Sequence, residues 1–146
     1  MIIKNSSLKN NKMGNKSKGS NAERELLHMF WSKSWPCLRS AGSGSMKYPG
    51  PDLLAGSQDK NRRVAIECKT SKTNKIYLNE HDVSQLKEFS EIFDARPWFA
   101  VRFFRKNWLF VSIEDIDKTP TGYVIDEKKA ELKGLSFEEL ISYDAK

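Results

Sequence analysis

Two acidic residues and one lysine stand in two short apolar segments near the middle of this chain. Asp52 lies in the segment 51–55, and Glu67 lies in the segment 62–70 with Lys69 two residues after it. Both segments have the composition of strands, and the short polar turn between them lets them lie side by side. Since alternate side chains of a strand share a face, Glu67 and Lys69 project to one side. We therefore expect all three side chains to meet at one edge of a sheet.

These residue types suit the hydrolysis of a phosphodiester with the help of a metal ion. Two neighbouring carboxylates repel each other unless a positive charge neutralises them. Mg²⁺ prefers carboxylate and carbonyl oxygens as ligands, and near a phosphodiester it lowers the pKa of a water molecule and stabilises the charge that develops on the phosphate. Lys69 would then steer the attacking water or balance the charge on phosphorus.

The elements that must position these residues can be read along the chain. A helix is predicted from Ser20, because Ser20 and Glu23 have the spacing of a capping box, and Pro36 is predicted to end it. A second helix is predicted with Asn79 as its N-cap. Its buried stripe comprises Val83, Leu86, Phe89 or Ser90, and Phe93. Strands are predicted at 37–40, 51–55, 62–70, 96–104 and 107–113, with a brief extended piece at 76–78.

The resulting order is helix, three strands, helix, two strands. This order predicts an α/β fold in which one mixed sheet carries helices on its faces. The later part of the chain reads as acidic and loose until a short helix at 137–141, which Ser136 and Glu139 would cap. We expect three parts: a disordered basic arm at 1–19, a catalytic domain at 20–113 and a C-terminal extension at 114–146, packed on or loosely attached to that domain.

The charge is unevenly distributed over the 146 residues. The net charge is +6, of which residues 1–19 contribute five lysines and no acid, whereas residues 114–146 hold nine acidic and five basic side chains. The basic surplus therefore lies on the arm and on the segment that carries Asp52 and Glu67. A polyanionic partner such as nucleic acid explains this distribution, and solubility alone is the competing explanation.

The composition also narrows the class of protein. Hydrophobic residues make up 38% of the chain, and no apolar run is long enough to cross a bilayer or to form a secretory signal. Two cysteines are too few for a disulfide scaffold and fit a reducing compartment. We expect a cytoplasmic protein that does not associate with membranes. Met13 is an alternative start to Met1.

Pro51, Asp52, Glu67 and Lys69 together resemble the P-D…(D/E)-x-K signature of restriction-endonuclease-like nucleases. Further segments resemble the archaeal Holliday junction resolvases, in that family's order and over roughly residues 18–113. They read KGSNAERELL, RSAGSGS, PDLLA, IECK, IYL and FAVRF. The resemblance implies a restriction-endonuclease-like core with a central five-stranded mixed sheet. It also implies a metal-dependent endonuclease, assembled as a homodimer, that cuts four-way DNA junctions.

The same resemblance implies roles for particular residues. Glu23 would complete a metal site whose direct ligands are Asp52 and Glu67, with the carbonyl of Cys68 as a further ligand. Lys69 would be the catalytic lysine. Glu23 has an alternative role as the partner of Ser20 in the capping box.

Further implied roles fall on a loop, on two arginines and on the second helix. Ser43 matches a serine that the family needs for cleavage, although the stretch that follows it, GSMKYPGP, is longer than in the shorter family members. Arg24 and Arg39 match residues that hold phosphates, and solvated surface charge is their alternative. Phe89 and Phe93 are candidates for a dimer interface, with an ordinary core position as the alternative.

Three functions fit the sequence, and we expect the first of them. The first is a Mg²⁺-dependent endonuclease that resolves four-way junctions by paired nicks. The second is a nuclease of the same fold that acts on linear or damaged duplex DNA, and the third is a DNA-binding module without catalysis. The sequence leaves open whether Mn²⁺ substitutes for Mg²⁺, and whether a branch-migration motor or a sliding clamp is a partner.

Overall fold

The computed structural model describes residues 19–40 and 47–142. The described chain begins in a helix, residues 19–32, called here the first helix. The strands that follow are β1 (Cys37–Arg39), β2 (Leu53–Ser57), β3 (Arg62–Ser71), β4 (Lys75–Asn79), β5 (Arg96–Phe103), β6 (Leu109–Ser112), β7 (Asp117–Thr119) and β8 (Gly122–Asp126). The helices are α2 (Glu80–Phe93), the 3₁₀ helix η1 (Ile113–Asp115), α3 (Glu127–Lys133) and α4 (Phe137–Ser142).

A mixed sheet of five strands forms the centre of the protein. Its order is β1-β2-β3-β5-β6, in which β3 and β5 run parallel and the other neighbours run antiparallel. Parallel strands need a crossover connection, and β4 with α2 supplies it between β3 and β5. The predicted α/β class with a five-stranded mixed sheet and flanking helices is confirmed.

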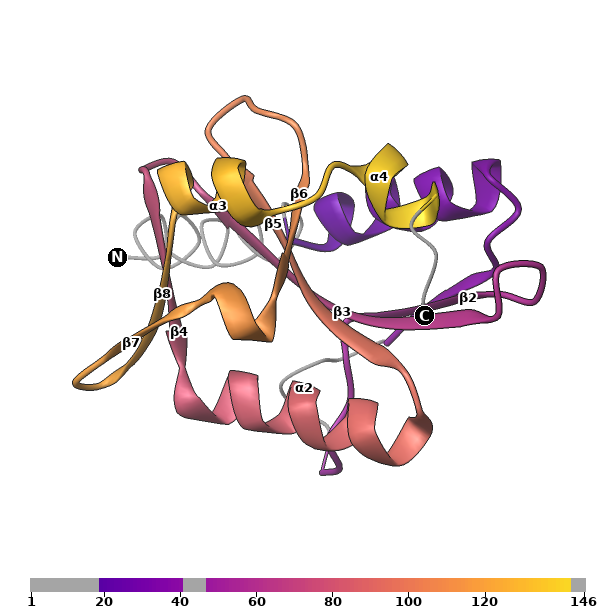
Figure 1. The fold of residues 1–146 in the computed structure, drawn as a ribbon, viewed down its shortest axis with the longest axis horizontal. Coiled ribbons are helices and arrows are strands. Elements are labelled where there is room, and N and C mark those ends of the chain that lie inside the picture. Colours follow the sequence, from indigo (N-terminus) through magenta and orange to yellow (C-terminus); the bar gives the residue numbers. More distant parts are fainter. Residues whose placement is uncertain (1–18, 41–46, 143–146) are drawn as a thin grey trace, which may run out of the picture.

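Two hydrophobic cores cover the two faces of this sheet. On one face the first helix and α4 pack around Phe30, Phe110 and Leu140. On the other face α2 and the smaller sheet β4-β8-β7 pack around Leu86 and Phe99. Figure 1 shows α2 on the opposite side of the sheet from α4 and the first helix. No helix of the described ranges is long and apolar enough to span a bilayer.

The beginning of the first helix differs from the prediction. Ser20 lies inside the helix, and both its hydroxyl and the carboxylate of Glu23 accept hydrogen bonds from Arg39. The predicted capping box is therefore wrong, because both side chains point to β1 instead of the helix end. The helix also ends at residue 32, before Ser34 takes a left-handed conformation with φ 60°.

The region after β6 is more ordered than its polar sequence indicated. β7 and β8 form a hairpin that pairs with β4, and α3 packs over β6 and β8. Gly122 allows a close approach, because a Cβ there would lie 2.3 Å from the carbonyl oxygen of Leu78. The predicted final helix is confirmed as α4, where the hydroxyl of Ser136 accepts from the backbone N–H of Glu139 at 3.1 Å.

Helix α2 begins where the sequence predicted. The side chain of Asn79 accepts a hydrogen bond from the backbone N–H of Asp82 at 2.7 Å and caps the helix. The helix ends at Asp94, whose φ of 65° is left-handed. Its buried positions include Leu86 and Ser90, whereas Phe93 is 45% exposed, so the predicted stripe turns away from the core at its last residue.

Candidate active site

A cavity of about 350 Å³ lies between the N-terminal half of the first helix, the chain just before β2, the middle of β3 and the first turns of α2. Four of the predicted site residues line it together, namely Glu23, Asp52, Glu67 and Lys69. Cys68, whose carbonyl was predicted as a further metal ligand, also lines it. Tyr48, His81, Asp82 and Gln85 complete the polar part of the wall.

Asp52 is fixed by the pairing of β2 with β3. Leu53 is paired with Ile66, which places the residue before β2 beside the residues that follow Ile66. The carboxylate of Asp52 accepts a hydrogen bond from the backbone N–H of Cys68 at 2.9 Å, and the carbonyl of Asp52 accepts one from Ser40. Asp52 is 6% exposed. The backbone of β3 therefore holds this carboxylate in one orientation.

Glu67 is buried beside this aspartate with only 5% of its surface exposed. Burial, the charge of Asp52 and a hydrogen bond to the carboxyl of Asp52 together raise the pKa of Glu67 to about 8. The charge of Lys69 opposes this shift but does not cancel it. The site is therefore short of positive charge, because a carboxyl with this pKa retains its proton at neutral pH.

Lys69 is held by an aspartate that the sequence analysis did not select. Its ammonium group donates to the carboxylate of Asp82 at 3.0 Å, and both side chains are partly buried. Burial disfavours the charged form of Lys69, but the hydrogen bond and charge of Asp82, with the charges of Glu67 and Asp52, raise its pKa overall. Lys69 is therefore cationic and oriented by α2.

Glu23 reaches the cavity from the first helix and is bound to Arg39. The guanidinium of Arg39 donates to its carboxylate at 2.7 Å. Burial raises the pKa of Glu23 and the charge of Asp52 raises it further, whereas Arg39 and Arg24 lower it. Arg39 is partly buried, and Arg24 is exposed. Glu23 thus joins the carboxylate cluster with one cation already attached.

The donor groups fit a divalent cation that prefers oxygen ligands. Asp52 and Glu67 are buried, interact with each other and lack a neutralising charge of their own. Burial raises the pKa of the Cys68 thiol well above its usual value, so among the groups of this residue the carbonyl oxygen is the donor suited to Mg²⁺. Within residues 19–40 and 47–142, no group of three His, Cys, Asp or Glu side chains is arranged to hold a metal ion. Mg²⁺ commonly completes its coordination with water and substrate oxygens, so two carboxylates suffice.

The residues selected from the sequence have different places in the structure. Asp52, Glu67, Lys69 and Glu23 lie together, and their chemical roles stay predictions. Arg39 contacts this group through Glu23. Ser43 lies outside the described residues, and its role in cleavage stays a prediction.

Sequence reasoning missed the contribution of α2 to the site. Asp82, His81 and Gln85 line the cavity, and all three lie in the first turns of the helix that Asn79 caps. The signal was present in part, because an N-cap at Asn79 places Asp82 in the first turn. The sequence did not show that the connection through β4 brings the first turn of α2 back against Lys69.

Comparison with known proteins agrees with this geometry. The family model described as archaeal Holliday junction resolvase (Hjc) matches residues 14–146. The chain belongs to the archaeal Holliday junction resolvase family. It is 35% identical over 131 residues to the crossover junction endodeoxyribonuclease Hjc of Archaeoglobus fulgidus, covering 85% of this chain and 95% of that protein. It is 39% identical over 111 residues to the Hjc of Methanocaldococcus jannaschii, covering 76% of this chain and 77% of that one.

A solved structure in this family has the same fold. The 1.6 Å structure of Archaeoglobus fulgidus Hjc, described as a Holliday junction resolvase from an archaeal hyperthermophile, superposes with a TM-score of 0.77 and 33% sequence identity. The match covers 84% of this chain and 98% of that chain. The restriction-endonuclease-like core that the sequence motifs implied is therefore the fold of this chain, and the resolvase family accounts for most of its length.

Proposed function

We propose that this chain is an endodeoxyribonuclease that resolves four-way DNA junctions by paired nicks. One observation carries the proposal: a chain that matches the resolvase family over residues 14–146 gathers Asp52, Glu67 and Lys69 around one cavity. A non-catalytic DNA-binding module has no use for two buried acids that repel each other. That arrangement lowers stability, and binding to phosphates calls for cations instead.

The reaction is hydrolysis of a phosphodiester. Water attacks phosphorus, the bond from phosphorus to the 3′ oxygen breaks, and the products are a 5′-phosphate and a 3′-hydroxyl. Asp52 and Glu67 would hold Mg²⁺ with the Cys68 carbonyl, while Glu23 borders the same cavity. The bound ion would supply positive charge to the phosphate and lower the pKa of water. Mn²⁺, which favours similar oxygen ligands, is the natural substitute.

Lys69 and Asp82 act as a unit in this reaction. The ammonium group of Lys69 balances the charge that develops on the phosphate oxygens in the transition state. Asp82 restricts this flexible side chain to one place, since it accepts a hydrogen bond from it at 3.0 Å. A group that is already oriented stabilises the transition state at a lower entropic cost.

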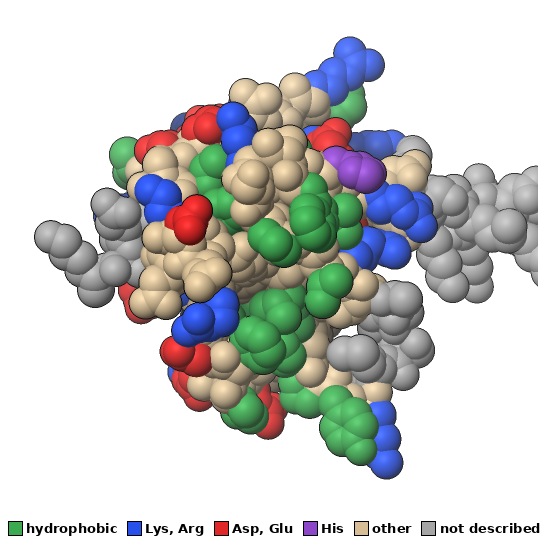
Figure 2. Space-filling model, turned by 90° about the vertical axis from the view of Figure 1, so that its right-hand side faces the viewer, with side chains coloured by type: hydrophobic (Ala, Val, Ile, Leu, Met, Phe, Trp, Pro, Cys, Tyr) green, Lys and Arg blue, Asp and Glu red, His purple; other side chains and the backbone are tan. Residues whose placement is uncertain are grey.

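A homodimer suits a substrate with near two-fold symmetry, because two copies present two active sites in matching positions. An apolar groove of about 240 Å³ lies between β1, β2 and α2 and includes Leu38, Leu54 and Phe89. The ring of Phe89 stacks on that of Phe93 with centroids 5.3 Å apart. Figure 2 shows hydrophobic side chains gathered on one face of the molecule.

The exposure of these side chains supports a second copy of the chain as the partner of this face. Leu38 is 71% exposed, Ile92 is 81% exposed and Phe93 is 45% exposed. Exposed aromatic and aliphatic groups in a cluster are typical of an interface centre. Arg39 connects this groove to the carboxylate cluster, because it borders the groove and binds Glu23. A dimer formed here would therefore hold both active sites close to the shared face.

A direct comparison of substrates tests the proposal. A mobile four-way junction and a linear duplex of equal length are incubated with the protein and Mg²⁺, and nicking rates are compared. The proposal expects the junction to be cut in opposed strands and the linear duplex to be nearly untouched. Preference for the linear duplex would support a restriction or repair nuclease instead, and binding without any cutting would support a binding module.

A further inference from the structure

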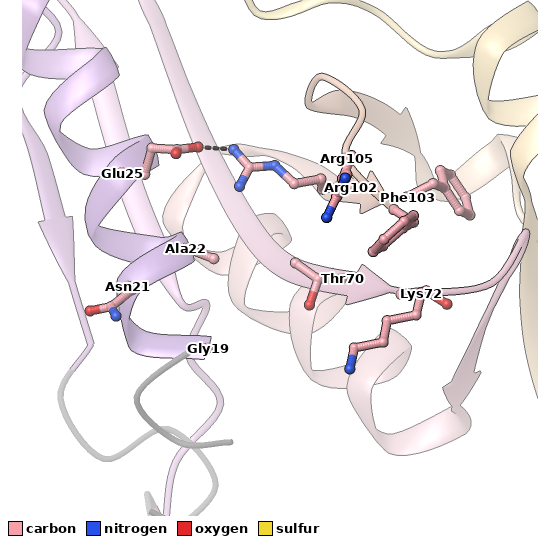
Figure 3. Close-up of a pocket in the computed structure, with 11 residues that line it drawn as sticks. Gly19, Asn21, Ala22, Glu25, Thr70, Lys72, Arg102, Phe103 and Arg105 are labelled. Atoms are coloured by element: carbon pink, nitrogen blue, oxygen red, sulfur yellow. Dashed lines mark hydrogen bonds and ion pairs between the residues drawn. The ribbon is translucent and has the colours of Figure 1, made fainter. Parts of the chain in front are cut away.

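A second cavity lies on the far side of the first helix from the carboxylate cluster. Its volume is about 620 Å³, and it is bounded by the start of the first helix, the end of β3 and the turn that follows β5. Figure 3 shows Lys72 extending from the end of β3, and Arg102 reaching across to Glu25. We call it the basic cavity, because Lys72, Arg102 and Arg105 line it against a single acid, Glu25.

Two of its three cations are available to a ligand. Lys72 and Arg105 are both exposed, and within residues 19–40 and 47–142 neither has an ion-pair partner. Arg105 instead lies over the ring of Phe104, at 5.0 Å from its centroid. Cations that are not neutralised within the protein and line a concave surface attract a polyanion.

The third cation forms a rigid wall. The guanidinium of Arg102 lies 4.3 Å from the ring centroid of Trp108 and forms an ion pair with Glu25. The indole N–H of Trp108 donates to the same carboxylate at 2.6 Å. Because these contacts hold Arg102 and neutralise Glu25, the positive charge of Lys72 and Arg105 is not cancelled by that acid.

The basic cavity and the active site share two elements. Lys69 of β3 borders the active site, whereas Thr70 and Ser71 at the end of β3, and Lys72 directly after it, border the basic cavity. On the first helix, Glu23 borders the active site while Asn21 and Ala22 border the basic cavity. Three residues of extended chain span at most ~10 Å, so the end of β3 brings the two cavities close together. A DNA strand that passes through the active site can therefore also contact the basic cavity.

We propose that the basic cavity binds a backbone phosphate of the DNA strand that is cut, beside the scissile phosphate. This inference rests on the proposed function and adds a second anchoring point to it. Lys72 and Arg105 contact the phosphate, and Arg102 shapes the wall. The contact fixes the direction of the strand across the active site and carries no sequence information.

The test removes the two charges while keeping the length of the side chains. Lys72→Gln combined with Arg105→Gln is compared with a matched control, Lys128→Gln combined with Lys133→Gln, which removes two exposed lysines from α3. Binding of the full chain to four-way junction DNA is measured by fluorescence anisotropy in Ca²⁺ at several salt concentrations. The cutting rate is measured in Mg²⁺ at saturating protein.

We expect the first variant to raise Kd by about tenfold or more and to reduce the magnitude of the salt slope by about 1 for each protomer. The control should match the wild-type protein in Kd, salt slope and cutting rate. Lys72→Arg with Arg105→Lys, which restores the charge, should restore binding. Equal losses in variant and control, or unchanged Kd and slope in the variant, would overturn the inference. A wild-type protein that does not select junctions contradicts the proposed function instead.

Discussion

Burial and the neighbouring Asp52 set the pKa of Glu67. With a pKa of about 8, the folded protein without metal holds one more proton than the unfolded chain between about pH 4.5 and 8. Its free energy of unfolding should therefore fall as the pH rises through this window, by on the order of a few kcal/mol in total. Below the window both states are protonated, and above it both are ionised.

Chemical denaturation in EDTA across this pH window measures the effect. Glutamine carries no charge at any pH. The free energy of unfolding of Glu67→Gln should therefore not fall as the pH rises through this window. Glu80→Gln, at an exposed site in the first turn of α2, serves as the control and should decline as the wild-type protein does. Identical pH profiles for the wild-type protein and Glu67→Gln would show that Glu67 has an ordinary pKa.

Asp82 is predicted to act on the chemical step through Lys69. Asp82→Asn keeps the shape of the side chain but removes the charge that orients the ammonium group, so the cutting rate at saturation should fall roughly 10- to 100-fold. The Kd for junction DNA should change little. Single-turnover cleavage and anisotropy measure the two quantities separately. A rise in Kd without a change in rate would instead assign Asp82 to DNA binding or to folding.

The individual residues of the site could be selected from the sequence, but their partners could not. Asp52, Glu67 and Lys69 are separated by one turn and two strands, so strand alternation alone places them together. Asp82 reaches Lys69 only after the chain has passed through β4 into α2. Arg39 binding to Glu23 likewise depends on the packing of the first helix over β1.

Helix α2 serves two surfaces at once. Its first turn supplies Asp82 to the active site, and its last turns present Phe89 and Phe93 beside the apolar groove. Phe93→Arg places a charge at the proposed interface centre, so dimer dissociation should become easier by about 2 kcal/mol or more. Analytical ultracentrifugation measures this change, and paired cutting of junctions should be lost with it.

The control for Phe93→Arg is Leu132→Arg, because Leu132 is also an exposed hydrophobic residue and lies on α3 instead of α2. It should leave the oligomeric state unchanged. A Phe93→Arg protein that remains dimeric would place the interface elsewhere. Circular dichroism of both variants separates loss of assembly from loss of folding.

Elements with a strong local signal were predictable, and those that depend on distant partners were not. α2 has a capping residue and a periodic apolar face, so its start at Asn79 was evident. β7 and β8 are short, and they form a sheet because β4 offers an edge far away in sequence. Tertiary pairing of this kind leaves little trace in local periodicity.

At the scale of the whole molecule, the C-terminal region closes the core that supports the first helix. The ring of Phe137 packs edge-on against that of Phe30, with the ring centroids 5.1 Å apart. Leu140 is fully buried in the same cluster. The carbonyl of Leu140 accepts a hydrogen bond from the buried Arg62 of β3. The end of the chain therefore stabilises the helix that carries Glu23.

Leu140→Ala should lower the free energy of unfolding by about 2–5 kcal/mol, since it leaves a cavity in a packed core. Leu132→Ala, at an exposed site on α3, should change it by less than about 0.5 kcal/mol. Urea denaturation measures both. Equal, small effects would mean that α4 is only loosely attached to the nuclease core.

The central claim is that the trio at the edge of β3 cuts the junction. Its most direct test is cleavage of a four-way junction, labelled in turn on each strand, by the wild-type protein and by Asp52→Ala, Glu67→Ala and Lys69→Ala in Mg²⁺. The wild-type protein should make paired nicks in opposed strands, with 5′-phosphate products. The three variants should not cut, although each still binds the junction. If all three variants cut at the wild-type rate, these residues are not the catalytic site.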